Sequence, residues 1–243
     1  METIIKLNSQ VAGKDKVARL LQYSCRTIWD SLNSKDDAQL ALISQLKNLE
    51  YILSSFRKLL RFGKSFEVFY GTLKSIHYSD AWLAFTITVT KICQATFLLT
   101  DHIIWLSRSG LFKNIDTTKW SLRSNRYWLV SLVMSLVRDI YEINRVIASF
   151  TSYKSLTSCI TSSIISIRCA KDVTVCASSV AEFLVTYKHL TIDTIKNICD
   201  LFIPLNGLGY IKMQPRIIGL LGVISSLMGL IVILDPSCKL LPQ

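Results

Sequence analysis

Residues 217–234 read IIGLLGVISSLMGLIVIL, and this stretch decides the class of fold. It carries no charged residue, is bounded by Arg216 and Asp235, and twelve of its eighteen residues are Leu, Ile or Val. On membrane-insertion scales, these residues favour the bilayer by roughly 4–7 kcal/mol. A helix of this length covers about 27 Å, enough for a thin bilayer. The stretch predicts a C-terminal transmembrane helix, and the alternative is the buried core helix of a soluble protein.

Four small residues within this stretch have spacings typical of helix–helix contacts: Gly222, Ser225, Ser226 and Gly229. Gly222 and Ser226 are four apart, as are Ser225 and Gly229, so each pair lies on one face of a helix. Small residues at this spacing allow two membrane helices to approach closely. We therefore expect them to pack against a second helix, with homo-oligomerisation as the expected use of the contact.

Composition agrees with a membrane protein. The chain has 243 residues, of which 50% are hydrophobic, with a formal net charge of +11 and a mean hydropathy of +0.37. Such apolar content excludes intrinsic disorder, and only 9 Gly and 4 Pro argue against a many-stranded β protein. A chain that is both apolar and basic favours contact with an anionic phospholipid membrane. Its seven cysteines form no C-x-x-C pair, which predicts free thiols in a reducing compartment.

Hydrophobic periodicity predicts helices along most of the remaining chain. The expected helices cover residues 10–32, a second helix with an apolar stripe over 46–60, 72–78 (continuing the pattern after Gly71), 81–106, a helix from Asp116 or Thr117 to about 150, and 177–205. Ser34 and Asp37 form an expected capping box before the second helix, and Ser79-Asp80 is the expected cap of 81–106. Residues 81–106 are only marginally apolar, because Lys91 near the centre offsets the gain from the aliphatic side chains. Two interpretations stay open for this segment: a membrane span or a buried bundle helix.

The end of the second helix is basic and amphipathic. Its apolar arc includes Ile52, Leu53, Phe56, Leu59 and Leu60, and its basic flank consists of Arg57, Lys58, Arg61 and Lys64. This pattern is typical of a helix that lies in the membrane interface, with apolar side chains among the acyl chains and cations at the headgroups. The alternative is an ordinary bundle helix with solvated charges.

The sequence contains no recognisable catalytic or nucleic-acid-binding motif, so we expect neither an enzyme nor a cofactor, metal or nucleic-acid site. The three histidines are far apart along the chain. Asp139 and Glu142 lie one helical turn apart between Arg138 and Arg145, which predicts ion pairs within one helix.

Several ordered strings resemble the peroxin-11 family of peroxisomal membrane proteins. They are FRKLLRFGK at 56–64, DHIIWL at 101–106 followed by SGL at 109–111, Trp120 with RS at 123–124 and RYWL at 126–129, RD and YE at 138–142, Asn197 with CDLFIPL at 199–205, and small residues in the terminal span. The resemblance implies an integral protein of the peroxisomal membrane that promotes elongation, proliferation and fission by inserting amphipathic helices and bending the bilayer. It assigns Arg57, Lys58, Arg61 and Lys64 to headgroups and the apolar arc to membrane insertion. The partners it implies are the phospholipid membrane, further copies of the chain, and a dynamin-like GTPase with its membrane fission adaptors.

The expected architecture is an all-α, membrane-associated helical bundle with four regions. Residues 1–80 form an amphipathic remodelling region, 81–148 carry hydrophobic helices, 149–196 form a Ser/Thr-rich connection, and 197–243 contain the span 217–234. The resemblance implies two crossings with both tails cytosolic, whereas Lys212 and Arg216 place the C-terminal tail in the lumen by the positive-inside rule. The alternative function is a pore for small metabolites in the same membrane.

Overall fold

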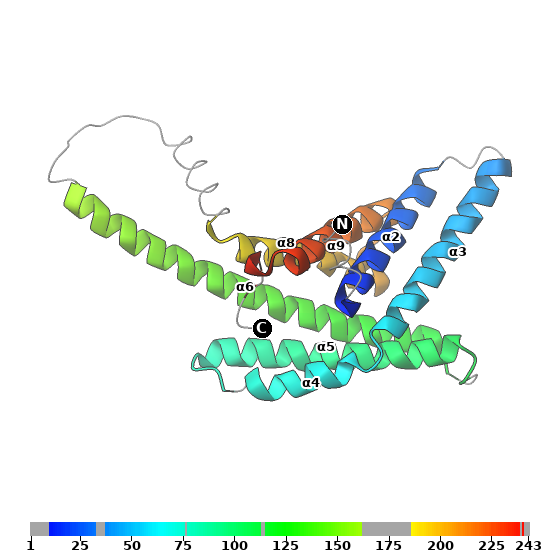
Figure 1. Ribbon diagram of the computed structural model, residues 1–243, viewed down its shortest axis with the longest axis horizontal. Helices are drawn as coiled ribbons and strands as arrows, with labels where there is room; N and C mark the ends of the chain where they lie inside the picture. Colours follow the sequence, from blue (N-terminus) through cyan, green and yellow to red (C-terminus); the bar gives the residue numbers. More distant parts are fainter. Residues whose placement is uncertain are drawn as a thin grey trace.

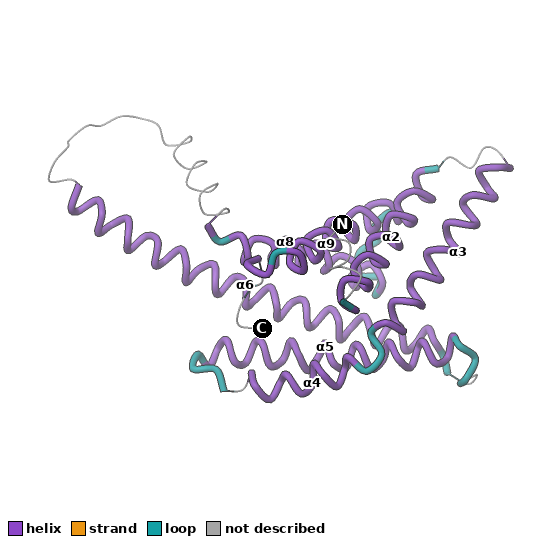
Figure 2. The backbone as a smooth tube through the Cα atoms, in the orientation of Figure 1, coloured by secondary structure: helices purple, strands orange, loops and turns teal. Residues whose placement is uncertain are grey.

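The expected all-helical fold is confirmed. The structure is a computed structural model that describes residues 10–32, 37–75, 77–112, 115–161, 186–238 and 240, and the regular structure in these ranges is entirely helical (Figure 2). The helices are α2 (Val11–Ser31), α3 (Asp37–Leu60), α4 (Lys64–Ser75), α5 (Ala81–Arg108), α6 (Thr117–Thr161), α8 (Lys188–Gly207), α9 (Pro215–Leu234) and the 3-10 helix η1 (Pro236–Cys238).

The helices form two packed groups (Figure 1). In one, α5 lies between α4 and the long α6, and in the other, α9 lies between α2 and α8. Contacts between α6 and α8 join the groups, and α3 runs from α2 towards the start of α4. Because α2 packs on α9, helices from the first and last parts of the sequence lie in one packed group.

Aspartate side chains cap the first turns of two helices. The Asp80 carboxylate accepts hydrogen bonds from the backbone N–H groups of Trp82 (3.0 Å) and Leu83 (3.3 Å), so the expected cap of α5 is confirmed. Asp116 accepts from Thr118 (3.1 Å) at the start of α6 in the same way. The expected capping box falls on Ser34, which lies outside the described residues.

A glycine turn separates α3 from α4. Gly63 has a φ of 80°, a conformation that residues with a Cβ rarely adopt, so the chain turns there. Gly71 instead lies within α4, which ends at Ser75. The helix expected over 72–78 therefore begins earlier and ends earlier.

The Ser/Thr-rich region is helical in both of its described parts. Helix α6 continues as far as Thr161, and α8 begins at Lys188, inside the region expected to connect the helices. Residues 162–185 lie outside the described ranges.

Two helices are long and apolar enough to cross a membrane, α5 and α9. They correspond to the marginal segment at 81–106 and the terminal span at 217–234. Helix α9 begins with Pro215 in its first turn, a position where the missing N–H costs nothing.

The small residues of α9 pack against α2 of the same chain, which differs from the expected use between copies. Gly222, Ser225, Ser226 and Gly229 are all buried. A Cβ on Gly222 would overlap the ring of Tyr23, and one on Gly219 would lie 2.9 Å from the backbone nitrogen of Thr27. These residues therefore permit close approach of two helices, but both helices belong to one molecule.

Candidate functional site: a cationic cavity between the helix groups

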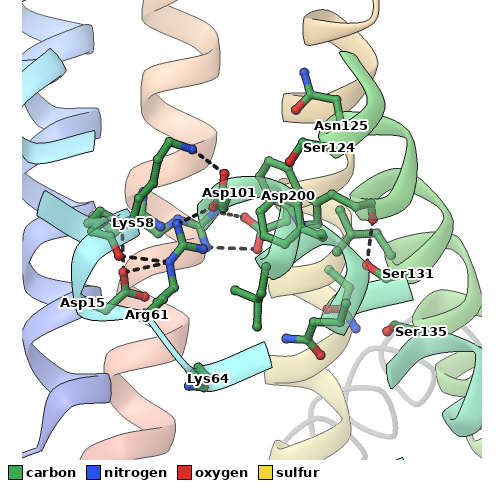
Figure 3. A pocket seen from close by; sticks show the side chains of 18 of the residues that line it. Asp15, Lys58, Arg61, Lys64, Asp101, Ser124, Asn125, Ser131, Ser135 and Asp200 are labelled. Carbon is green, nitrogen blue, oxygen red and sulfur yellow. Dashed lines mark hydrogen bonds and ion pairs between the residues drawn. The ribbon is translucent and has the colours of Figure 1, made fainter. Parts of the chain in front are cut away.

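A polar cavity of about 450 Å³ lies among α2, α3, α5, α6 and α8, with Lys64 at the start of α4 also in its lining. Nine cationic side chains line it (several are drawn in Figure 3): Lys16, Arg19, Arg57, Lys58, Arg61, Lys64, Lys91, Arg138 and Lys196. Three carboxylates line it as well: Asp15, Asp101 and Asp200. A cavity of this composition attracts anions and has few features of an apolar ligand pocket.

Asp15 binds two of the cations from α3. Its Oδ1 lies 3.1 Å from Arg57 Nε and 3.6 Å from Arg61 Nε. Burial acts to raise the pKa of Asp15, but the neighbouring charges of Arg57, Arg61 and Lys16 hold it below its usual value. Burial, followed by repulsion from Arg61, lowers the pKa of Arg57 to about 10. Arg57 also donates to Gln22 Oε1 at 2.8 Å, so α2 and α3 are joined by charge-assisted hydrogen bonds.

Asp101 of α5 binds two further cations of α3. Its two carboxylate oxygens accept separately, Oδ1 from Lys58 and Oδ2 from Arg61 at 3.0 Å. The backbone carbonyl of Arg61 is also 3.0 Å from His102 Nε2. These contacts fix the end of α3 against α5 (Figure 3).

Arg19 and Asp200 connect α2 to α8 across 181 residues of sequence. The guanidinium donates from both terminal nitrogens, one of them at 3.2 Å, and both side chains are buried. Burial acts to raise the pKa of Asp200, but the charges of Arg19 and Lys16 and the hydrogen bonds to its carboxylate together lower it. A bidentate pair of this kind sets the register between two helices.

A buried ionic cluster joins α6 to α8. Arg138 donates to Asp139 (2.8 Å) and to Asp193 (2.5 Å), and Asn197 donates to Asp139 (2.7 Å). Asp193 also pairs with Lys196. The ion pairing expected within one helix is found between Arg138 and Asp139, and pairing with Asp193 of α8 adds to it, because this part of α6 is buried.

The basic flank of α3, which was expected to face lipid headgroups, lies mostly inside the protein. Arg57, Lys58 and Arg61 face inward and are neutralised by aspartates of α2 and α5, because α3 packs its polar side on these helices. Lys64 lines the cavity mouth and is exposed. Contact of the four cations with headgroups stays a prediction, and in this conformation Lys64 is the member that solvent reaches.

The predicted apolar arc faces outward. Ile52, Phe56 and Leu59 are exposed, and Leu53 and Leu60 are half-buried. Sequence reasoning missed the continuation of this surface along α4, where Phe66, Phe69 and Leu73 are also exposed. Their spacing of three and four residues was the available signal.

Within the described residues, no group of three or more His, Cys, Asp or Glu side chains is arranged to hold a metal ion. Four cysteines there carry free thiols: Cys25, Cys93, Cys199 and Cys238. The site offers concentrated positive charge rather than a nucleophile beside a base.

The fold and the site define a helical membrane protein with apolar outer surfaces and a charged interior. Residues 1–234 match the family model described as Peroxisomal biogenesis factor 11 (PEX11), and the chain belongs to this family.

The relatives agree. The chain is 32% identical to Peroxisomal membrane protein 11B of Bos taurus over 259 residues, covering 100% of both chains. It is 31% identical to Peroxisomal membrane protein 11A of Homo sapiens over 99% of both chains. Peroxisomal membrane protein PMP30A of Candida boidinii is 24% identical, over 93% of this chain and 91% of its own. No solved structure matches the chain.

These matches confirm the resemblance to the peroxin-11 family and the location in the peroxisomal membrane. The chain is therefore a peroxisomal membrane protein of a family of peroxisome biogenesis factors.

Proposed function

We propose that this protein promotes peroxisome elongation, proliferation and fission by inserting the end of α3 and the whole of α4 into one leaflet of the membrane. The observation that carries the proposal is the orientation of these helices. On α4, the polar residues Ser65, Thr72 and Ser75 are buried, whereas Phe66 is 72% exposed and Phe69 is 59% exposed.

The amphipathic pattern of α4 is therefore the reverse of that in a water-soluble bundle, where the apolar stripe faces the core. Its inner side is held by polar contacts, since Lys91 of α5 donates to the Gly71 carbonyl (3.2 Å) and to Ser75 Oγ (2.7 Å). The end of α3 repeats the pattern, with Arg57 inside and Phe56 outside. An apolar aromatic surface of this extent needs an apolar environment.

A helix that enters one leaflet adds area to that leaflet alone, and curvature relieves the resulting stress. Lys64, at the junction of α3 and α4, supplies an exposed cation for anionic headgroups. Self-association and recruitment of a dynamin-like GTPase with its membrane fission adaptors belong to the same proposal, and they come from the family resemblance.

The test is reconstitution of the full-length protein into vesicles of phosphatidylcholine and phosphatidylserine, with vesicle shape recorded by electron microscopy. We expect the wild type to form tubules and the variant with Phe66→Glu and Phe69→Glu to leave vesicles round. Both side chains point away from the protein, so the variant should keep its helical circular dichroism and its melting temperature.

The matched control is the double variant with Leu40→Glu and Leu42→Glu, which places the same two charges on exposed positions near the other end of α3. Leu40 lies about 160° around the helix from Phe56. The control should form tubules normally. Equal tubulation by the double variant and the wild type would refute the proposal.

A pore for small metabolites is the second candidate function, and the cationic cavity is the observation that favours it. One side of the candidate span α5 lines this cavity, including Thr90, Lys91 and Gln94. Anion flux through the reconstituted protein without any change in vesicle shape would favour the pore over remodelling.

A further inference from the structure

The charges of the cavity are not balanced within the protein. Nine cations line it, and five aspartates pair with them: Asp15, Asp101 and Asp200 in the lining, and Asp139 and Asp193 behind Arg138. An excess of four positive charges therefore surrounds one enclosed space. Uncompensated charge in a partly desolvated space is unfavourable, so an anion bound there would stabilise the folded protein.

Lys16 is a buried cation of the cavity lining that shares α2 with Arg19. Asp200 and Asp15 act on its charge, but neither forms an ion pair with it among those found in the described residues. Burial and repulsion from Arg19 lower the pKa of Lys16 to about 7. Its aliphatic chain lies against α9, since a Cβ on Gly229 would be 2.9 Å from Lys16 Cε. The side chain is thus held in position beside the cavity.

Two further donors are buried without an acceptor among the described residues. Ser124 is 3% exposed, lines the cavity, and its hydroxyl makes no hydrogen bond. Arg19 Nε is also unsatisfied, although the other nitrogens of this guanidinium bind Asp200. Buried donors without partners are rare in folded proteins, and each marks a place where a ligand or water completes the bonding.

We propose that this cavity is a binding site for a phosphate-bearing anion, held by Lys16, Arg19 and Ser124 and entered beside Lys64. A phosphate monoester carries roughly −1.5 to −2 charges at pH 7 and three strong acceptor oxygens, which suits a space with excess cations and unsatisfied donors. The volume of about 450 Å³ accommodates more than the phosphate group itself. Lys64, Gln94 and Ser121 are both exposed and part of the lining, so the cavity opens to solvent beside them.

The phosphate group can belong to a soluble compound or to a lipid headgroup, and two arms of one experiment separate these sources. In the first arm, inorganic phosphate is titrated into the full-length protein in a non-ionic detergent. In the second, the protein is placed in nanodiscs of phosphatidylcholine with or without phosphatidic acid. The readouts are calorimetric binding and the shift in melting temperature.

We expect saturable binding in at least one arm, with affinity reduced about tenfold or more by Lys16→Met, as expected for one lost charge-assisted hydrogen bond. Ser124→Ala should weaken binding by a smaller factor and provides a second variant with minimal effect on folding. Lys119→Met is the matched control, because the Lys119 side chain is 78% exposed and outside the cavity. It should bind like the wild type.

Saturation by inorganic phosphate alone assigns the site to soluble phosphate compounds, and binding only with phosphatidic acid assigns it to a headgroup. Absence of saturable binding in both arms would overturn the proposal, as would unchanged affinity in both Lys16→Met and Ser124→Ala. The site does not depend on membrane bending, since the variant with Phe66→Glu and Phe69→Glu should bind phosphate normally.

Discussion

At the scale of single residues, Asp101 connects two cations of α3 to α5. Lys58 and Arg61 both end on its carboxylate, and all three side chains are largely buried. Removing one member of a buried ionic group leaves the others without compensation in a medium that solvates them poorly, which costs more than the pair contributed. The same reasoning applies at Asp15 and Asp200, so the interior depends on a few carboxylates.

Asp101→Asn is therefore expected to destabilise the protein by about 3–5 kcal/mol. The measurement is thermal unfolding of the full-length protein in detergent, followed by circular dichroism at helical wavelengths. Asp37→Asn, at an exposed position in the first turn of α3, is the control and should have little effect. Equal melting temperatures for the two variants would show that Asp101 is not an essential link.

Lys16 gives a prediction for pH dependence. Its pKa is about 7 in the folded protein against 10.5 for an unperturbed lysine, so the unfolded chain binds more protons between these values. Stability from this group therefore rises as pH increases from about 7 towards 10. The pKa values of the neighbouring Asp15 and Asp200 are held low and that of Arg19 is raised, so these three groups keep their charges over this range.

We expect the wild type to gain melting temperature between about pH 7 and pH 8.5, below the range in which ordinary thiols are largely ionised. Lys16→Met should lack this gain. The difference between the two proteins isolates Lys16 from other titrating groups. A parallel response of both proteins would contradict the assignment.

At the scale of elements, the contact between α2 and α9 depends on the absence of side chains. Tyr23 occupies the space above Gly222, and Thr27 occupies the space above Gly219. The small residues of α9 therefore allow α2 to lie close to this candidate membrane span. Van der Waals contact of this kind is the main attraction between helices when lipid replaces water.

Gly222→Leu should force these helices apart and destabilise the protein by about 1–3 kcal/mol, the usual cost of overpacking. Leu220→Ala is the control, because Leu220 is 51% exposed on another face of α9. Thermal unfolding in detergent compares the two variants. A Gly222→Leu protein as stable as the wild type would indicate that α2 does not pack closely on this face.

At the scale of the whole molecule, the N-terminal and C-terminal helices depend on each other. Cys25 of α2 is buried on the side towards Glu50 of α3, whereas Cys93 belongs to α5 in the other group. Removal of residues 215–243 should uncover the opposite face of α2, which holds Tyr23 and Thr27, and loosen the packing of α2 on α3. We expect the rate of Cys25 alkylation, measured by mass spectrometry of its peptide, to rise about tenfold or more when this local protection is lost.

Cys93 is the internal control, and its alkylation rate should change little because its packing group stays intact. An unchanged rate at Cys25 in the truncated chain would show that α2 keeps its packing on α3 without α9. A comparable rise at both thiols would show that the two helix groups unfold together.

Much of the secondary structure followed from periodicity and capping chemistry. Asp80 and Asp116 start helices because an aspartate before an apolar repeat satisfies the first amides locally. The orientation of α3 could not be predicted from periodicity or capping chemistry. A helix with an apolar arc and a basic flank can face either side inward, and the choice depends on Asp15 and Asp101, which are 42 and 40 residues from their partners Arg57 and Arg61.

The sequence by itself determined the all-helical class, the apolar span at 217–234, the family and the peroxisomal membrane as the location. These properties depend on hydrophobic periodicity, on one uncharged apolar run and on short sequence motifs, all of which can be read from neighbouring residues. The tertiary structure alone decided that the basic flank turns inward, that the glycines of α9 receive α2, and that nine cations meet around one cavity. Such features arise from contacts between residues far apart in the chain, where the energy of burying a charge depends on which carboxylate the fold brings beside it.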